Sequence, residues 1–103
     1  MALMNKYLLG CSPYIHDLKY DLDKRTVVVT CFRDTIDWIP GKTVTFADVH
    51  SFSEQIFEDA FDKELIDIIM GLHMISDGEY CLYTEKRKLV LKVGTEPVSQ
   101  NID

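Results

Sequence analysis

Residues 43–61 read TVTFADVHSFSEQIFEDAF, and the spacing of their apolar side chains changes halfway along the stretch. Over residues 43–49 apolar and polar side chains alternate, which is typical of a β-strand with one buried face. Apolar side chains then recur at helical spacing over residues 52–61. Ser51, with Glu54 three residues later, matches a capping box, which closes the backbone donors at a helix start. We therefore predict a strand that runs directly into a short helix.

The segments before this stretch indicate a β-hairpin. Residues 14–22 alternate loosely, and residues 26–32 are dense in β-branched side chains after a short polar break. Both patterns are typical of neighbouring strands joined by a tight turn. Residues 33–42 form a loop that ends on the strong turn signal Pro40-Gly41.

The segments after this stretch predict further strands. Residues 65–75 are almost entirely apolar and contain Gly71, which lowers helix propensity by about 1 kcal/mol relative to alanine. A strand is favoured there, and a continuation of the helix stays open. Residues 80–84 and 88–93 indicate a strand meander. The predicted fold class is α+β, with about six mostly antiparallel strands in a β-sandwich or curled sheet and one short helix after the third strand.

The length of the chain and its net charge limit the number of domains and the classes of partner. The chain of 103 residues predicts a single domain over residues 1–103, with an ordered core at 14–93. Residues 1–13 are expected to be a lead-in and residues 94–103 a frayed tail. The net charge of −6 disfavours binding to nucleic acid or to an anionic membrane, and it favours a basic protein as partner.

The cysteines indicate a reducing compartment. Cys11, Cys31 and Cys81 are odd in number and widely spaced, which argues against a disulfide framework and against a structural zinc site. No apolar run approaches the roughly 18 residues of a membrane-spanning helix. We therefore expect a cytoplasmic protein.

The histidines give no local sign of catalysis or metal binding. His16, His50 and His73 lie in three different predicted elements, and none has a second ligand at zinc-binding spacing. We therefore predict no catalytic residue, no metal and no cofactor. One alternative stays open, a small hydrolase or ligand-binding protein in which histidines and acids converge in a pocket.

A protein-binding surface is the leading functional prediction. Acids far outnumber bases between residues 48 and 67, so the predicted helix presents an acidic face. Trp38, on the loop before it, is a candidate anchor because loop aromatics are enriched in binding hot spots. A solvated helix face, and a tryptophan that caps the core, are the alternatives. The candidate partner-binding residues are Trp38, Asp48, Glu54, Glu58, Asp59 and Asp62.

Two short motifs carry a resemblance to a known family: Ile15-His16-Asp17 at the start of the first strand, and Phe46-Ala47-Asp48-Val49 before the helix. The order of elements and these motifs resemble small bacterial β-sandwich proteins, several of which are immunity proteins encoded beside polymorphic toxins. The resemblance implies a non-enzymatic protein that binds and inhibits a toxin, and an acidic face would suit a basic nuclease. That group supplies no catalytic residues to transfer.

A third functional class is open as well. Exposed strand edges can pair between chains, so the protein could serve as a structural subunit of a phage or of another oligomeric assembly. Both a monomer and a homodimer are compatible with the sequence.

Overall fold

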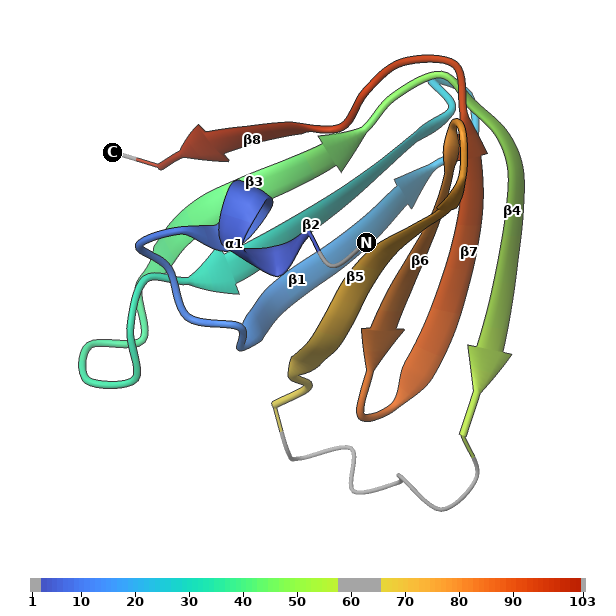
Figure 1. Ribbon diagram of the computed structural model, residues 1–103. Helices are drawn as coiled ribbons and strands as arrows, with labels where there is room; N and C mark the ends of the chain where they lie inside the picture. Colours follow the sequence, from blue (N-terminus) through green and yellow to red (C-terminus); the bar gives the residue numbers. More distant parts are fainter. Residues whose placement is uncertain (1–2, 58–65, 103) are drawn as a thin grey trace.

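The computed structural model describes residues 3–57 and 66–102, and almost all of the regular structure in these residues is strand (Figure 1). The strands form two four-stranded antiparallel sheets that pack against each other, an arrangement consistent with a β-sandwich. The predicted α+β fold with six strands and a helix after the third strand is therefore wrong. The two sheets contain eight strands within the described ranges.

The first sheet contains β1 (Ile15–Asp21), β2 (Thr26–Phe32), β3 (Pro40–Phe46) and β8 (Val98–Asn101), in the order β1-β2-β3-β8. The predicted N-terminal hairpin is confirmed by the pairing of β1 with β2. The frayed tail expected at the C-terminus is corrected, because β8 pairs with β3 over four register positions. Ser99, Gln100 and Asn101 of β8 are polar, which fits an edge position, and they give no alternating apolar pattern.

The second sheet contains β4 (Val49–Ile56), β5 (Ile69–Ser76), β6 (Glu79–Thr84) and β7 (Arg87–Val93), in the order β4-β7-β6-β5. The expected meander is confirmed by β6 and β7, and the strand favoured for the apolar segment before them is confirmed by β5. Gly78 turns the chain between β5 and β6 with φ of 75°, a conformation that glycine adopts without steric cost.

The predicted helix is a strand, β4, in its described part. Phe52, Glu54 and Ile56 pair with Leu91, Leu89 and Arg87 of β7, so these three alternate side chains share the inner face of the sheet. Glu54 is polar, and its inward position leaves two apolar residues four apart, which imitates helical spacing. The Ser51 capping box has no helix to cap, and residues 58–61 of the prediction lie outside the described ranges.

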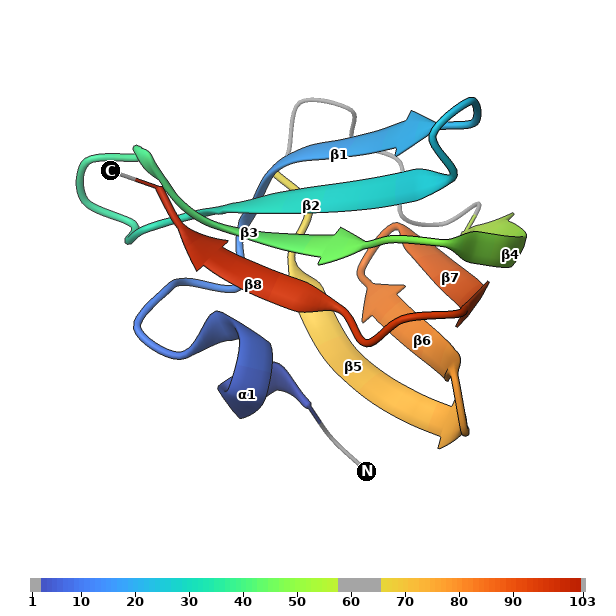
Figure 2. The same cartoon turned by 90° about the horizontal axis from the view of Figure 1, so that it is seen from above.

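The chain passes from one sheet to the other at a tight corner between β3 and β4. Figure 2 shows the two sheets inclined to each other, with β3 leading directly into β4. Only Ala47 and Asp48 separate the two strands, and Asp48 has φ of 53°. The corner is tied to the β1–β2 turn, because the Val49 N–H donates to the Arg25 carbonyl at 3.0 Å. Such bends at strand ends are how chains change sheets in packed sheet pairs.

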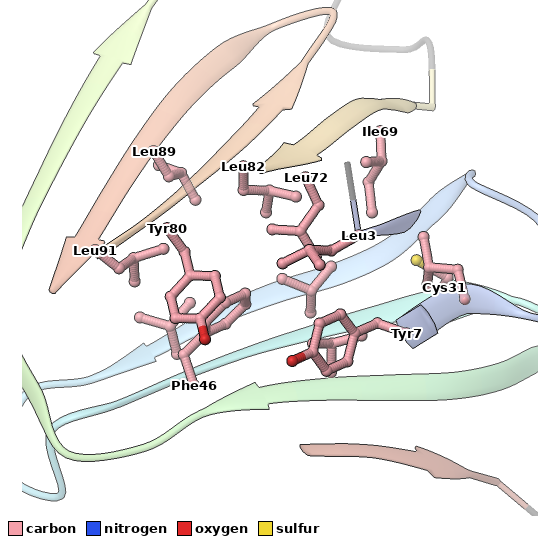
Figure 3. Packing of buried hydrophobic residues seen from close by; sticks show 14 of the residues in the cluster. Leu3, Tyr7, Cys31, Phe46, Ile69, Leu72, Tyr80, Leu82, Leu89 and Leu91 are labelled. Atoms are coloured by element: carbon pink, nitrogen blue, oxygen red, sulfur yellow. The ribbon is translucent and has the colours of Figure 1, made fainter. Parts of the chain in front are cut away.

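The inner faces of both sheets form one hydrophobic core (Figure 3). Phe46 from the first sheet meets Tyr80 from the second with ring centroids 6.1 Å apart. Leu82, Leu89 and Leu91 are at most 1% exposed. Each such side chain contributes about 1.5–3 kcal/mol through burial.

The N-terminal segment covers the free edge of β5. It contains the short helix α1 (Met4–Leu8), next to the buried side chain of Leu3. The Leu3 N–H donates to the Leu72 carbonyl at 2.7 Å, and the Ile69 N–H donates to the Pro13 carbonyl at 2.9 Å. The expected lead-in is therefore part of the packed structure. Within the described chain no helix has the length and apolar character to cross a membrane.

Candidate functional site

The predicted partner-binding residues do not gather on one surface. Trp38 lies before β3 and Asp48 lies after it, so the seven residues of the strand separate them by roughly 23 Å at about 3.3 Å per residue. Glu54 lies on the other sheet. Outside the described residues lie the remaining three candidates, Glu58, Asp59 and Asp62. The predicted acidic helix face is wrong in its described part, because residues 49–56 form the strand β4.

Trp38 caps one end of the core. Its ring meets Tyr14 and Phe32 edge to face, with centroids 5.7 and 5.2 Å apart. The side chain is 42% exposed, so one part of the ring is still open to solvent. This placement corresponds to the capping alternative, with an exposed remainder available for contact.

Asp48 and Glu54 both have internal roles. Asp48 adopts a left-handed conformation at the corner, its carboxylate lies 3.4 Å from His50 Nε2, and its carbonyl accepts from the Gly94 N–H at 2.9 Å. Glu54 accepts a hydrogen bond from the Tyr20 hydroxyl at 2.7 Å and another from Arg87 Nη1 at 3.3 Å. Its side chain is only 24% exposed. Glu54 thus joins the open edges of the two sheets.

The contacts of Glu54 belong to a larger polar network that the sequence did not reveal. Arg87 Nε lies 3.8 Å from Asp67 Oδ2, and the same oxygen accepts from the Thr84 hydroxyl at 2.8 Å. Asp67 Oδ1 accepts from the Ile68 N–H at 2.9 Å. One cation, Arg87, lies between the two carboxylates, so it attracts both and offsets one of their two negative charges. One sign of this network was present in the sequence, which is that charged residues, Glu54 and Arg87, occupy inward-facing positions of β4 and β7.

The histidines are scattered. The His16 ring packs edge-on against Phe32 at 5.1 Å, His50 faces Asp48, and His73 lies on β5. Among residues 3–57 and 66–102, no group of three or more histidine, cysteine or acidic side chains is arranged to hold a metal ion. The hydrolase alternative therefore has no convergent pair of histidines.

The open edge of β4 is a candidate site that the sequence did not indicate. β4 is the last strand of its sheet, and among the described strands it pairs only with β7. A groove of about 280 Å³ runs between the start of β4 and the β1–β2 turn, and its walls include Tyr20, Leu22, Val49 and Phe52. Leu22 is 86% exposed and Phe52 38% exposed. The Tyr20 and Phe52 rings meet with centroids 4.7 Å apart and form the apolar floor.

Comparisons of this chain with protein families, with curated proteins and with solved structures each find no match.

The other strand edges are better protected than β4. The edge of β5 is covered by the N-terminal segment, and β8 is only four residues long. β1 carries the exposed Lys19–Asp17 ion pair. Short strands, covering segments and edge charges are the usual means by which proteins block strand addition. β4 has eight residues, no lysine and no proline, and its one acid, Glu54, is bonded inward.

Proposed function

We propose that the protein is a non-enzymatic binding module that receives an extended segment of a partner protein along the open edge of β4. The observation that carries this proposal is the combination of an eight-residue edge strand, which has one strand partner among residues 3–57 and 66–102, with an apolar groove beside it. In strand addition, backbone hydrogen bonds supply affinity, and grooves for alternate side chains supply specificity.

The chemistry of the partner follows from the two parts of this surface. An apolar side chain of the added strand enters the groove between Leu22 and Phe52, and its neighbours in sequence point away. The net charge of −6 favours a strand with lysine or arginine at the outward positions. If the partner is a basic toxin, binding of this kind would inhibit it by occupying its surface, as the family resemblance implies.

The test is selection of octapeptides from a random library displayed on phage, against the full chain. We expect the selected peptides to alternate apolar and polar residues, to be rich in lysine or arginine, and to bind more weakly at high salt. In the complex, amide protons of β4 at the free edge should become protected from hydrogen exchange. Protection confined to other strands, or selected peptides without this pattern, would contradict the proposal.

Two exposed leucine-sized residues provide a matched pair of variants. Leu22→Ser removes a wall of the groove and should weaken peptide binding about tenfold, the effect of losing one buried apolar side chain. Ile36→Ser, at an 84% exposed position of the β2–β3 loop, should leave the affinity unchanged. Equal effects of the two variants would place the binding surface elsewhere. Light scattering of the free protein adds an independent check, because a stable dimer joined through β4 would make a second copy the occupant.

A further inference from the structure

A second hollow, of about 360 Å³, lies where α1 meets the β5–β6 hairpin and the chain that follows β7. Lys6 and Tyr7 come from α1, Met74 and Tyr80 from the hairpin, and Glu96 from the segment before β8. Ligand pockets in proteins have volumes of about 300–1,000 Å³. This cavity is at the lower end of that range, so it has room for a molecule of one or two rings.

Five of the residues that line this cavity are apolar or aromatic, and about half of the exposed surface of its walls is polar. Leu3, Tyr7, Tyr80 and Val93 line it and belong to the buried core. Met74 stands at its mouth and is 36% exposed. A methionine side chain adapts to the shape of a ligand, and its sulfur makes favourable contacts with aromatic rings.

Tyr80 brings an unpartnered hydroxyl to the cavity. The residue is only 6% exposed, and its hydroxyl has no hydrogen-bond partner among the described residues. Figure 3 shows the hydroxyl ends of Tyr80 and Tyr7 directed into the same part of the interior. The hydroxyl is open to the cavity, where water can solvate it in the free protein. A ligand oxygen that accepts a hydrogen bond from Tyr80 would take the place of that water.

The charged groups at the rim select against anionic ligands. Glu96 forms an ion pair with Lys6 and accepts from the Tyr7 hydroxyl at 3.4 Å. The hydrogen bond from Lys6 lowers the pKa of Glu96, and burial raises the pKa of Tyr7, so the rim holds a carboxylate, an ammonium and a neutral phenol. The Lys6–Glu96 charges compensate each other, and Asp77 adds an uncompensated acid that repels anions. A primary ammonium ion carries only hydrogen-bond donors, so it cannot accept a hydrogen bond from Tyr80.

We propose that this cavity binds a small neutral aromatic molecule of one or two rings, whose carbonyl or hydroxyl oxygen accepts a hydrogen bond from Tyr80. The site is separate in its residues from the β4 groove, and it stands whether or not that groove binds a partner.

The probes are acetophenone, benzoate and benzylamine, titrated into the full chain and followed by amide chemical shifts. Acetophenone should bind saturably and shift amides of the hairpin and of residues 93–96. Benzoate and benzylamine should bind about tenfold more weakly or not at all, because Asp77 repels the carboxylate of benzoate and the ammonium of benzylamine cannot accept a hydrogen bond from Tyr80. Absence of saturation by acetophenone, or equally tight binding of either charged probe, would overturn the proposal.

Two pairs of variants locate the site. Met74→Trp fills the mouth and should abolish acetophenone binding, whereas Met70→Trp, on the same strand but outside the cavity, should leave it intact. Tyr80→Phe removes only the hydroxyl and should weaken binding about fivefold. Tyr83→Phe, at a 43% exposed position, should have no effect. If Tyr80→Phe and Tyr83→Phe bind equally well in chains with the same circular dichroism, the assigned contact is wrong.

Discussion

The Thr84 hydroxyl donates a hydrogen bond to Asp67 Oδ2 at 2.8 Å, and Thr84 is completely buried. The same hydroxyl oxygen accepts from the backbone N–H groups of Lys86 and Arg87, at 3.1 and 3.0 Å. One side chain thus closes the β6–β7 turn and anchors the segment that enters β5. It also keeps in place the carboxylate that faces Arg87.

Thr84→Val should destabilise the protein by about 1–3 kcal/mol. The substitution keeps the shape of the side chain, but it removes the hydroxyl partner of Asp67 Oδ2 and of the Arg87 N–H. The Lys86 N–H keeps Asp67 Oδ1 as an acceptor at 3.3 Å. Urea unfolding followed by circular dichroism measures the loss. Thr45→Val, at a half-buried position on the outer face of β3, is the control and should change the free energy of unfolding little. Equal losses in the two variants would remove the special role of the Thr84 hydroxyl.

The Tyr20 phenol should ionise far above its ordinary range. Burial, and then the hydrogen bond to Glu54, raise the pKa of Tyr20 from 10.0 to about 12. The folded state therefore favours the protonated phenol. Its contribution to stability is complete below pH 10 and is lost as the pH rises from 10 to about 12.

The ultraviolet absorbance of phenolate, compared between the native chain and Tyr20→Phe, isolates this ionisation. In Glu54→Gln the pKa should fall but stay above 10.0, because burial is the larger cause. Ionisation of Tyr20 at its ordinary value in the folded protein would show that neither the burial of the phenol nor its contact with Glu54 persists in solution.

The corner at Asp48 should tolerate only certain residues. With φ of 53°, a β-branched side chain is strained, so Asp48→Val should cost about 1–2 kcal/mol of stability. Asp48→Asn keeps the conformation that asparagine readily adopts, and should be near neutral. Thermal unfolding measures both variants. Asp23→Val, in the β1–β2 turn, is the comparison, and a loss as large as that of Asp48→Val would show that backbone strain is not the cause.

Glu96 should report on the docking of α1. The hydrogen bond with Lys6 lowers the pKa of Glu96 below 4.5, so the pair stabilises the fold above that pH and loses its effect as the pH falls through the lowered pKa. Carboxyl carbon shifts, followed by NMR, measure this titration. Lys6→Met should return the pKa of Glu96 toward 4.5, whereas Lys19→Met, which breaks an ion pair on β1, should not change it.

The sequence predicted those strands whose side chains follow a simple alternation. β2 is dense in β-branched residues, and β6 and β7 are joined by a short polar turn, so local preference and tertiary structure agree there. β4 was missed because an inward-facing position holds Glu54, whose partners Tyr20 and Arg87 come from distant strands. No local pattern reveals that such a charge is paired across the molecule.

The candidate sites depend even more on distant contacts. Tyr7, Tyr80 and Glu96 meet in one cavity although they are far apart in sequence, and their roles follow from the covering of β5 by α1. The prediction of one binding surface around Trp38 and Asp48 was wrong for a similar reason. The two residues are only ten positions apart in sequence, but the extended strand β3 lies between them and places them at its opposite ends.

The N-terminal segment has a consequence for the behaviour of the chain during synthesis and storage. β5 carries no charged residue, and Met70 and Ile75 on it are exposed. A long uncharged edge is a template for intermolecular aggregation, and here the hydrogen bonds from Leu3 and to Pro13 occupy it. Removal of residues 1–13, or a bulky tag that prevents α1 from docking, should turn a monodisperse protein into one that forms fibrils or precipitates.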